Sequence, residues 1–134
     1  MSVFVDTSAF IAIISPSDEK HQDAAKAWRL LLEAGEELVT SGHVLIETIS
    51  LLHSRSGTEA VRRFVNAMVP AMKTVWLDQT SHDQAVILML DSPGKSGPSL
   101  VDCVSFEVIR RCRIKDVFVY DRHFENRGFN IVGE

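Results

Sequence analysis

The chain has 134 residues, of which 46% are hydrophobic and 24% are charged, and its formal net charge is −4. This size and balance are typical of a single soluble domain, assigned here to residues 1–134, with a core large enough to fold without disulfides. They exclude a membrane protein, because no apolar run approaches the ~18 residues of a transmembrane helix, and no signal peptide is expected because the first basic residue is Lys20.

The two cysteines, Cys103 and Cys112, are predicted to lie on one helix. Their separation in the sequence corresponds to about 13 Å along an α-helix, which is beyond the reach of a disulfide. Reduced thiols are typical of cytoplasmic proteins, and we expect that location for this chain.

Short β-favouring runs alternate with helical segments along the chain. In chain order the predicted elements are a strand at 2–5, helices at 7–15 and 18–35, a strand at 37–41, helices at 43–57 and 58–72, a strand at 73–77, helices at 81–90 and 99–113, and strands at 116–120 and 129–133. A loop rich in Gly and Pro is predicted at 91–98. This alternation predicts an α/β fold that is doubly wound, with a mainly parallel sheet of about five strands and helices on both faces.

Two acids directly follow predicted strands. Asp6 comes after "VFV" and Asp121 after "VFVY". Ligands of doubly wound sheets bind at the carboxyl ends of the strands, and neighbouring strands lie ~5 Å apart. The two carboxylates would therefore be close if these strands are neighbours. Taken singly, either acid is also explained as the N-cap of a following helix.

Two further acids lie within predicted helices among apolar neighbours. Glu47 is the only charged residue in "VLIETISLL", and Asp102 lies within "SLVDCVSF". A charge in such surroundings is costly to bury unless it is paired or bound to a metal. Glu47 also fits a narrow solvent-facing stripe, and Asp102 also fits a capping box with Ser99.

Together the four acids predict one metal site. Strand ends and the first turns of helices can open on the same edge of a doubly wound domain. Clustered carboxylates raise each other's pKa unless a cation lies among them, and oxygen ligands without a His or Cys set favour Mg²⁺ or Mn²⁺. The sequence has no HExxH, paired CxxC, EF-hand or glycine-rich phosphate loop that would compete with this interpretation.

The segments "VFVDTSAFIAII", "LVTSGHVLIETISLLHSRSG" and "SLVDCVSFEVIRRCRIKDVFVYDRHFENRGFNIV" carry a resemblance to a known family. In this order and at this spacing the chain resembles PIN-domain ribonucleases, and among them the VapC toxins of bacterial toxin–antitoxin pairs, over nearly its whole length. The resemblance implies an acidic metal site whose residues are Asp6, Glu47, Asp102 and Asp121.

The implied activity is hydrolysis of RNA phosphodiester bonds, with Mg²⁺ or Mn²⁺ as cofactor. Ser8 and Ser99 are candidates for a hydroxyl near the metal or the phosphate. Residues 110–127 carry six Lys or Arg against three acids, which fits either a phosphate-binding patch or a solvated helix end. The candidates for contacts with the RNA backbone are Lys95, Arg110, Arg111 and Arg122. The resemblance further implies a homodimer that a small antitoxin protein keeps silent, and no membrane partner.

Three alternatives remain open. The family often has Thr or Ser at the positions of Val101 and Val119, so an inactive PIN fold that only binds RNA or protein is the first. A phospho-acceptor receiver domain shares the fold class and the acidic cluster, but it needs a lysine where this chain continues with Arg122. A phosphatase of the haloacid dehalogenase type is weaker still, since it needs a second Asp at the position of Ser8.

Overall fold

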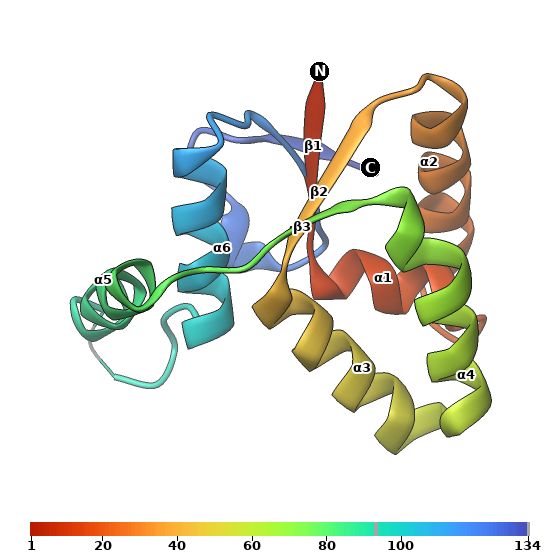
Figure 1. Cartoon of the computed structure of the whole chain (residues 1–134), viewed down its shortest axis with the longest axis horizontal. Coiled ribbons are helices and arrows are strands. Elements are labelled where there is room, and N and C mark those ends of the chain that lie inside the picture. Colours follow the sequence, from red (N-terminus) through yellow and green to blue (C-terminus); the bar gives the residue numbers. More distant parts are fainter. Residues whose placement is uncertain (93, 134) are drawn as a thin grey trace.

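Five strands form one sheet in which every strand runs parallel to its neighbours (Figure 1). The structure is a computed structural model and describes residues 1–92 and 94–133. The strands are β1 (Ser2–Val5), β2 (Glu37–Ser41), β3 (Lys73–Val75), β4 (Asp116–Phe118) and β5 (Asn130–Val132), in the spatial order β3-β2-β1-β4-β5. The prediction of a doubly wound, parallel α/β domain is confirmed. The central strand is β1, and it pairs with β4, which is the arrangement that brings Asp6 and Asp121 to neighbouring strand ends.

Helices cover both faces of this sheet (Figure 1). They are α1 (Thr7–Ile14), α2 (His21–Glu33), α3 (Gly42–Ser56), α4 (Thr58–Arg63), α5 (Gln79–Leu90) and α6 (Leu100–Arg111). The pair α5 and α6 packs on one side, and α1 packs against α2 on the other. Within the described residues, no helix combines the length and apolarity that crossing a bilayer requires.

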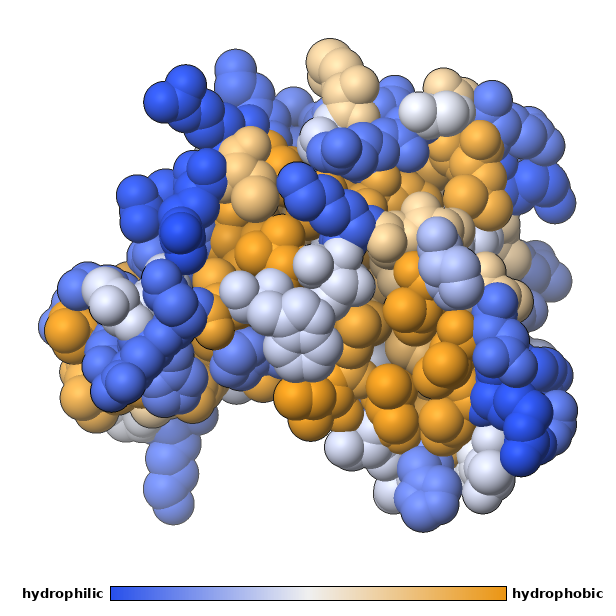
Figure 2. All heavy atoms as spheres, viewed as in Figure 1, coloured by the Kyte–Doolittle hydropathy of each residue, from blue (hydrophilic) through white to orange (hydrophobic). Residues whose placement is uncertain are grey.

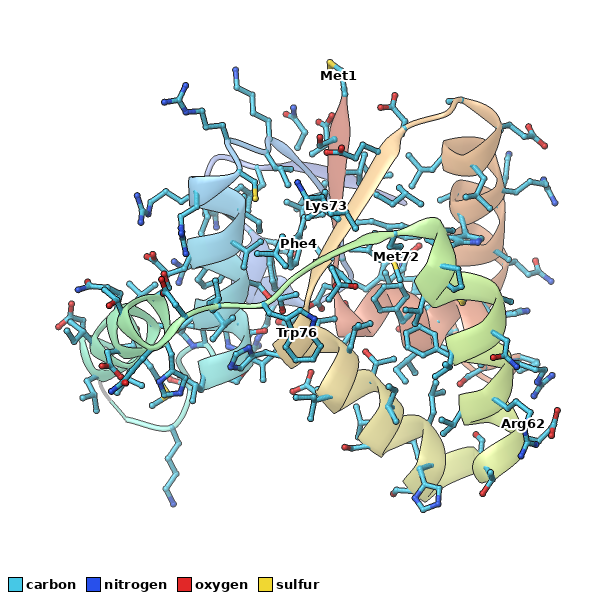
Figure 3. The ribbon with its side chains drawn as sticks, in the orientation of Figure 1. Met1, Phe4, Arg62, Met72, Lys73 and Trp76 are labelled. Carbon is cyan, nitrogen blue, oxygen red and sulfur yellow. The ribbon has the colours of Figure 1, made fainter. Side chains whose placement is uncertain are left out.

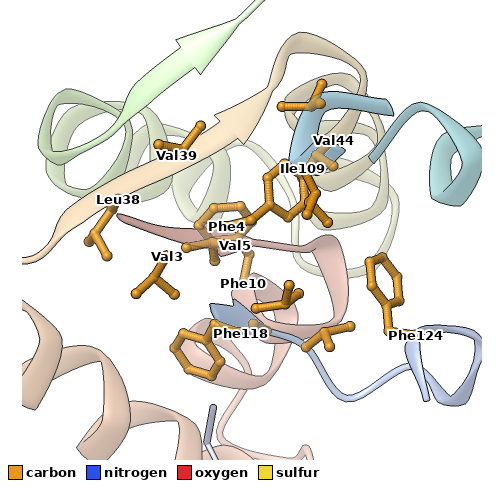
Figure 4. Packing of buried hydrophobic residues seen from close by; sticks show 14 of the residues in the cluster. Val3, Phe4, Val5, Phe10, Leu38, Val39, Val44, Ile109, Phe118 and Phe124 are labelled. Carbon is orange, nitrogen blue, oxygen red and sulfur yellow. The ribbon is translucent and has the colours of Figure 1, made fainter. Parts of the chain in front are cut away.

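The core lies on both faces of the central strands (Figure 4). Phe4, Val5 and Phe118 have no solvent-exposed surface, because a strand covered by helices on both sides buries successive side chains in opposite directions. Phe10 of α1 meets Phe64 edge to face, with ring centroids 5.1 Å apart. The acids that follow β1 and β4 are therefore attached to strands that are buried in the core.

The helix that carries Glu47 begins without a connecting loop. Ser41 is the last residue of β2 and also the N-cap of α3, since its hydroxyl accepts the N–H of Val44 at 3.0 Å. The indole of Trp76 lies over Gly42, the first residue of α3, and any Cβ at this position would overlap the ring (Figure 3). Any other residue at this position would have to displace the indole, so glycine is favoured here.

Two predicted helices differ from the observed ones. The helix predicted at 18–35 begins only at His21, because the Asp18 carboxylate accepts the N–H of Lys20 at 2.8 Å and closes a turn instead. The helix predicted at 58–72 is divided into α4, a π-helical turn (Phe64–Met68) and a 3₁₀ turn (Val69–Ala71). Pro70 explains the change, since it lacks the N–H that an α-helix needs at that position. The predicted loop at 91–98 includes Pro93, which lies outside the described residues.

Candidate metal centre

The carboxyl ends of the strands open into a pocket of about 1050 Å³. All four predicted acids line it, and so do the predicted residues Ser8, Ser99 and Lys95. Each acid belongs to a different part of the fold. Asp6 follows β1, Glu47 lies on α3, Asp102 lies on α6, and Asp121 follows β4. The structure therefore brings together residues that are spread over 116 positions of the chain, from Asp6 to Asp121.

Asp6 is the most deeply buried of these acids, with 3% of its surface exposed. It caps α1, as one interpretation of the sequence predicted, because its Oδ2 accepts the N–H of Ser8 at 3.1 Å. Burial raises the pKa of Asp6 to about 7, and the charges of Asp102 and Asp121 contribute in the same direction, against the hydrogen bonds from Ser8. A cap on a solvated helix end does not have such a pKa, so the capping role does not account for this residue fully.

Ser8 connects two strand ends through one hydroxyl. Its Oγ donates to Asp6 Oδ2 at 2.8 Å and accepts the backbone N–H of Tyr120 at 2.9 Å. Tyr120 is the residue before Asp121. The hydroxyl therefore fixes the position of the first acid relative to the segment that carries the last one.

Asp102 forms the capping box that the sequence suggested and also lines the pocket. Ser99 Oγ accepts the N–H of Asp102 at 3.1 Å, and Asp102 Oδ2 accepts the N–H of Ser99 at 3.1 Å, which completes a capping box at the start of α6. The same carboxylate lines the pocket and is 6% exposed. Burial and the charge of Asp121 raise its pKa above the usual range.

Glu47 and Asp121 are more accessible than the other two acids. Glu47 is half-buried on α3 and faces the pocket one turn after the helix start. Asp121 caps the short 3₁₀ turn Arg122–Phe124, and its Oδ1 accepts the N–H of His123 at 2.8 Å. The pocket thus combines two buried carboxylates with two that solvent or a ligand can approach.

His123 is a pocket residue that the sequence did not single out. Its imidazole lies between two of the acids, with Nδ1 2.9 Å from Asp121 Oδ1 and 3.6 Å from Asp102 Oδ2. One ligand atom from each of these three residues lies within 4.8 Å of the other two, which suits a bound metal ion. The spacing Asp121-x-His123 in a tight turn is the signal that could have pointed to this residue.

The predicted cationic contacts divide into two groups. Lys95 lines the pocket, together with Lys20 and Arg55, which the sequence did not single out. The other three candidates do not line it. Arg110 is paired with Glu107 on the exposed surface of α6, Arg111 donates to the Ser81 hydroxyl at 2.6 Å, and Arg122 is exposed.

The sheet is all-parallel, and four carboxylates share one pocket at the ends of its strands. These features define the class of this protein: an α/β domain with an acidic site suited to divalent cations. A sequence model of the PIN domain matches residues 3–130, and the chain belongs to the PIN domain family. The predicted resemblance to this family is thereby confirmed.

Individual relatives agree with this assignment. The chain is 28% identical to the 23S rRNA-specific endonuclease VapC20 of Mycobacterium tuberculosis over 95% of both chains. The crystal structure of that protein, described as a Sarcin–Ricin loop cleaving toxin, superposes with a TM-score of 0.80 at 27% identity over 95% of both chains. VapBC2 of Rickettsia felis, solved with a promoter DNA fragment, has a TM-score of 0.69 at 10% identity over 98% of this chain and 97% of that one, and shares the fold.

Proposed function

We propose that this chain is an endoribonuclease that hydrolyses RNA phosphodiester bonds with the help of a divalent metal ion, and that it is the toxin of a toxin–antitoxin pair. The observation that carries this proposal is the convergence of the four acids on one pocket of a PIN domain. The similarity to a 23S rRNA-specific endonuclease along 95% of both chains supports the same conclusion. Membership of the PIN family also sets aside the receiver and phosphatase alternatives.

The residues of the pocket fit a divalent cation. Asp6 holds a carboxyl whose pKa of about 7 reflects burial beside two further carboxylates, and a cation would offset both effects. The buried Nδ1 of His123 has no hydrogen-bond partner among the described residues. We propose Mg²⁺ or Mn²⁺ as the ion and assign Asp6, Asp102 and Asp121 to hold it. When bound, the ion supplies an activated water and stabilises negative charge on the phosphate.

The remaining residues have separate roles in this proposal. Glu47 accepts a hydrogen bond from the attacking water and orients it, because it is the acid that approaches the pocket from α3. Ser8 positions Asp6 through its hydrogen bond, and Ser99 positions Asp102 through the capping box. Three cationic side chains at the pocket, Lys20, Arg55 and Lys95, contact the RNA backbone without reading its sequence.

The direct test is incubation of the purified chain with 23S rRNA, which is the substrate named for VapC20. We expect discrete fragments in the presence of Mn²⁺ or Mg²⁺, none with EDTA, and recovery of cleavage when the ion is restored. Cleavage that persists in EDTA would contradict the metal requirement. Binding of RNA without any cleavage would support the inactive alternative that Val101 and Val119 suggested.

The partner proposal has its own tests. Co-expression with the product of a neighbouring small gene should yield a complex in which RNA cleavage is suppressed. We also propose a homodimer. Figure 2 shows apolar side chains gathered over α3 and α4, and the large hydrophobic residues Trp76 and Ile46 are 64% and 57% exposed, which supports the proposal. Light scattering on the purified chain would measure its mass, and a monomer would contradict the dimer.

A further inference from the structure

The imidazole of His123 is oriented by a contact on the far side of its ring. Nε2 lies 3.0 Å from the backbone carbonyl oxygen of Ser96. A carbonyl oxygen only accepts hydrogen bonds, so Nε2 carries the hydrogen that is donated to it. A charged ring would also donate from Nδ1 to Asp121, whereas a ring that binds a metal is neutral, and in the neutral ring Nδ1 is left with a lone pair.

That lone pair faces the acids rather than a donor. Nδ1 lies 2.9 Å from Asp121 Oδ1 and 3.6 Å from Asp102 Oδ2, and it is buried without a hydrogen-bond partner in the described part of the chain. Ionised carboxylates have no hydrogen to donate. Three electron-rich atoms that face one another are stabilised by a cation placed among them. Ligand atoms that are each about 2.1 Å from one ion lie at most ~4.2 Å apart, and the Nδ1 distances of 2.9 Å and 3.6 Å are within this limit.

We infer that His123 is itself a metal ligand, binding the ion through Nδ1 beside Asp102 and Asp121. This inference rests on the proposed function only in placing a metal in the same pocket. It replaces the all-oxygen ligand set expected from the sequence with a mixed one. Because Mg²⁺ prefers oxygen ligands whereas imidazole suits transition metals, a nitrogen ligand favours Mn²⁺ over Mg²⁺ at this site.

Pulsed electron paramagnetic resonance on the full chain loaded with Mn²⁺ tests the inference without any measurement of activity. A directly bound imidazole gives nitrogen modulation of the electron spin echo, and chain labelled with ¹⁵N-histidine gives a changed modulation. His123 is the one histidine that lines the pocket in the described residues. We therefore expect the signal in wild type and in the His53→Gln control, and its loss in His123→Gln.

The glutamine variant is chosen for its shape. Its amide nitrogen can take the place of Nε2 and keep the contact with the Ser96 carbonyl, while nothing replaces Nδ1. Calorimetric titration should show the Kd for Mn²⁺ raised by roughly tenfold or more, since loss of even an indirect metal partner has an effect of that size. The Kd for Mg²⁺ should change much less.

Each result decides the question. Nitrogen modulation that is absent from Mn²⁺-loaded wild type, or that survives in His123→Gln, overturns the inference, and metal-dependent RNA cleavage would then still support the proposed function. If wild type binds no Mn²⁺, the inference fails, and the metal requirement fails as well if the chain also binds no Mg²⁺. If His123→Gln does not fold, the labelled wild type alone gives the answer.

Discussion

The hydroxyls of Thr7 and Thr48 lie 3.2 Å apart, with Thr48 donating to Thr7, and both residues are buried. Each threonine directly follows an acid of the pocket, Asp6 in one case and Glu47 in the other. One hydrogen bond therefore joins the start of α1 to the middle of α3 and holds these two carboxylates at a fixed separation.

Thr48→Val should reduce RNA cleavage more than it reduces stability. Valine has nearly the shape of threonine but cannot donate to Thr7, so the expected loss of unfolding free energy is about 1 kcal/mol. We expect a fall in kcat of tenfold or more, roughly the effect of misplaced catalytic geometry. Single-turnover cleavage and thermal melts measure the two effects. The exposed Thr58→Val is the control, and wild-type kcat in Thr48→Val would refute the positioning role.

Asp6→Asn should stabilise the metal-free protein at neutral and alkaline pH. Asn is as good an N-cap as Asp, whereas the charge at this position is buried. The folded pKa of about 7 lies above the unfolded value of ~3.9. The folded state therefore binds more protons between these values, and its free energy of unfolding falls as pH rises from about 4 to about 7.

Thermal melts in a strong chelator at several pH values measure this effect. The melting temperature of Asp6→Asn should exceed that of wild type by roughly 5 °C or more at pH 8, and the difference should shrink as the pH is lowered toward ~4. Asp78→Asn removes the charge of an N-cap outside the pocket and should give no such gain. A lower melting temperature for Asp6→Asn at pH 8 would mean that Asp6 is only a cap.

Asp102→Asn should abolish cleavage and leave the fold nearly intact. The amide oxygen can still accept the N–H of Ser99, so the change in unfolding free energy should stay within ~1 kcal/mol, the usual scale of a cap. The charge that a divalent cation needs is lost. Cleavage of 23S rRNA and thermal melts are the measurements, again with Asp78→Asn as control. An active Asp102→Asn variant would leave this residue with its capping role alone.

Removing the cations at the pocket should weaken RNA binding in a salt-dependent way. We expect each of Lys20→Ala, Arg55→Ala and Lys95→Ala to lower the slope of log K against log salt by about 0.7, as for one lost contact with single-stranded RNA. Fluorescence anisotropy in an Asp102→Asn background measures binding without cleavage. If Arg110→Ala changes the slope and these three do not, the contact surface is the basic segment of α6 instead.

Two of the four acids, Asp6 and Asp121, were predictable because the sheet is parallel. Every strand of such a sheet ends on the same edge, so an acid after "VFV" and another after "VFVY" must meet if β1 and β4 pair, as they do. The alternation of elements predicted the doubly wound parallel sheet but left open whether these two strands are neighbours. Asp102 was predicted because it is a charge among apolar neighbours and from the resemblance to the family, and α6 does begin on the same edge.

Sequence reasoning missed His123 because the position of its side chain depends on the conformation of a loop. His123 reaches the acids because its ring is held by the carbonyl of Ser96, 27 residues away, and nothing in local sequence periodicity reports such a contact. The basic residues show a different limit of the sequence. Arg110 and Arg111 belong to the helix whose first turn lines the pocket, but a helix rises ~1.5 Å per residue, so they lie more than ten ångströms from that turn and do not line the pocket. Their predicted contact with RNA stays a prediction.

The burial of Asp6 also has a consequence for how this chain changes under selection. Asp6→Asn removes a charge that the folded protein holds at a raised pKa, so a change that is expected to end the proposed catalysis is also expected to favour folding of the metal-free chain. Where the activity harms its own host, selection against toxicity and selection for a well-folded chain would therefore act in the same direction at this position. Inactive copies arising by this route would accumulate as abundant, stable proteins rather than as degraded ones.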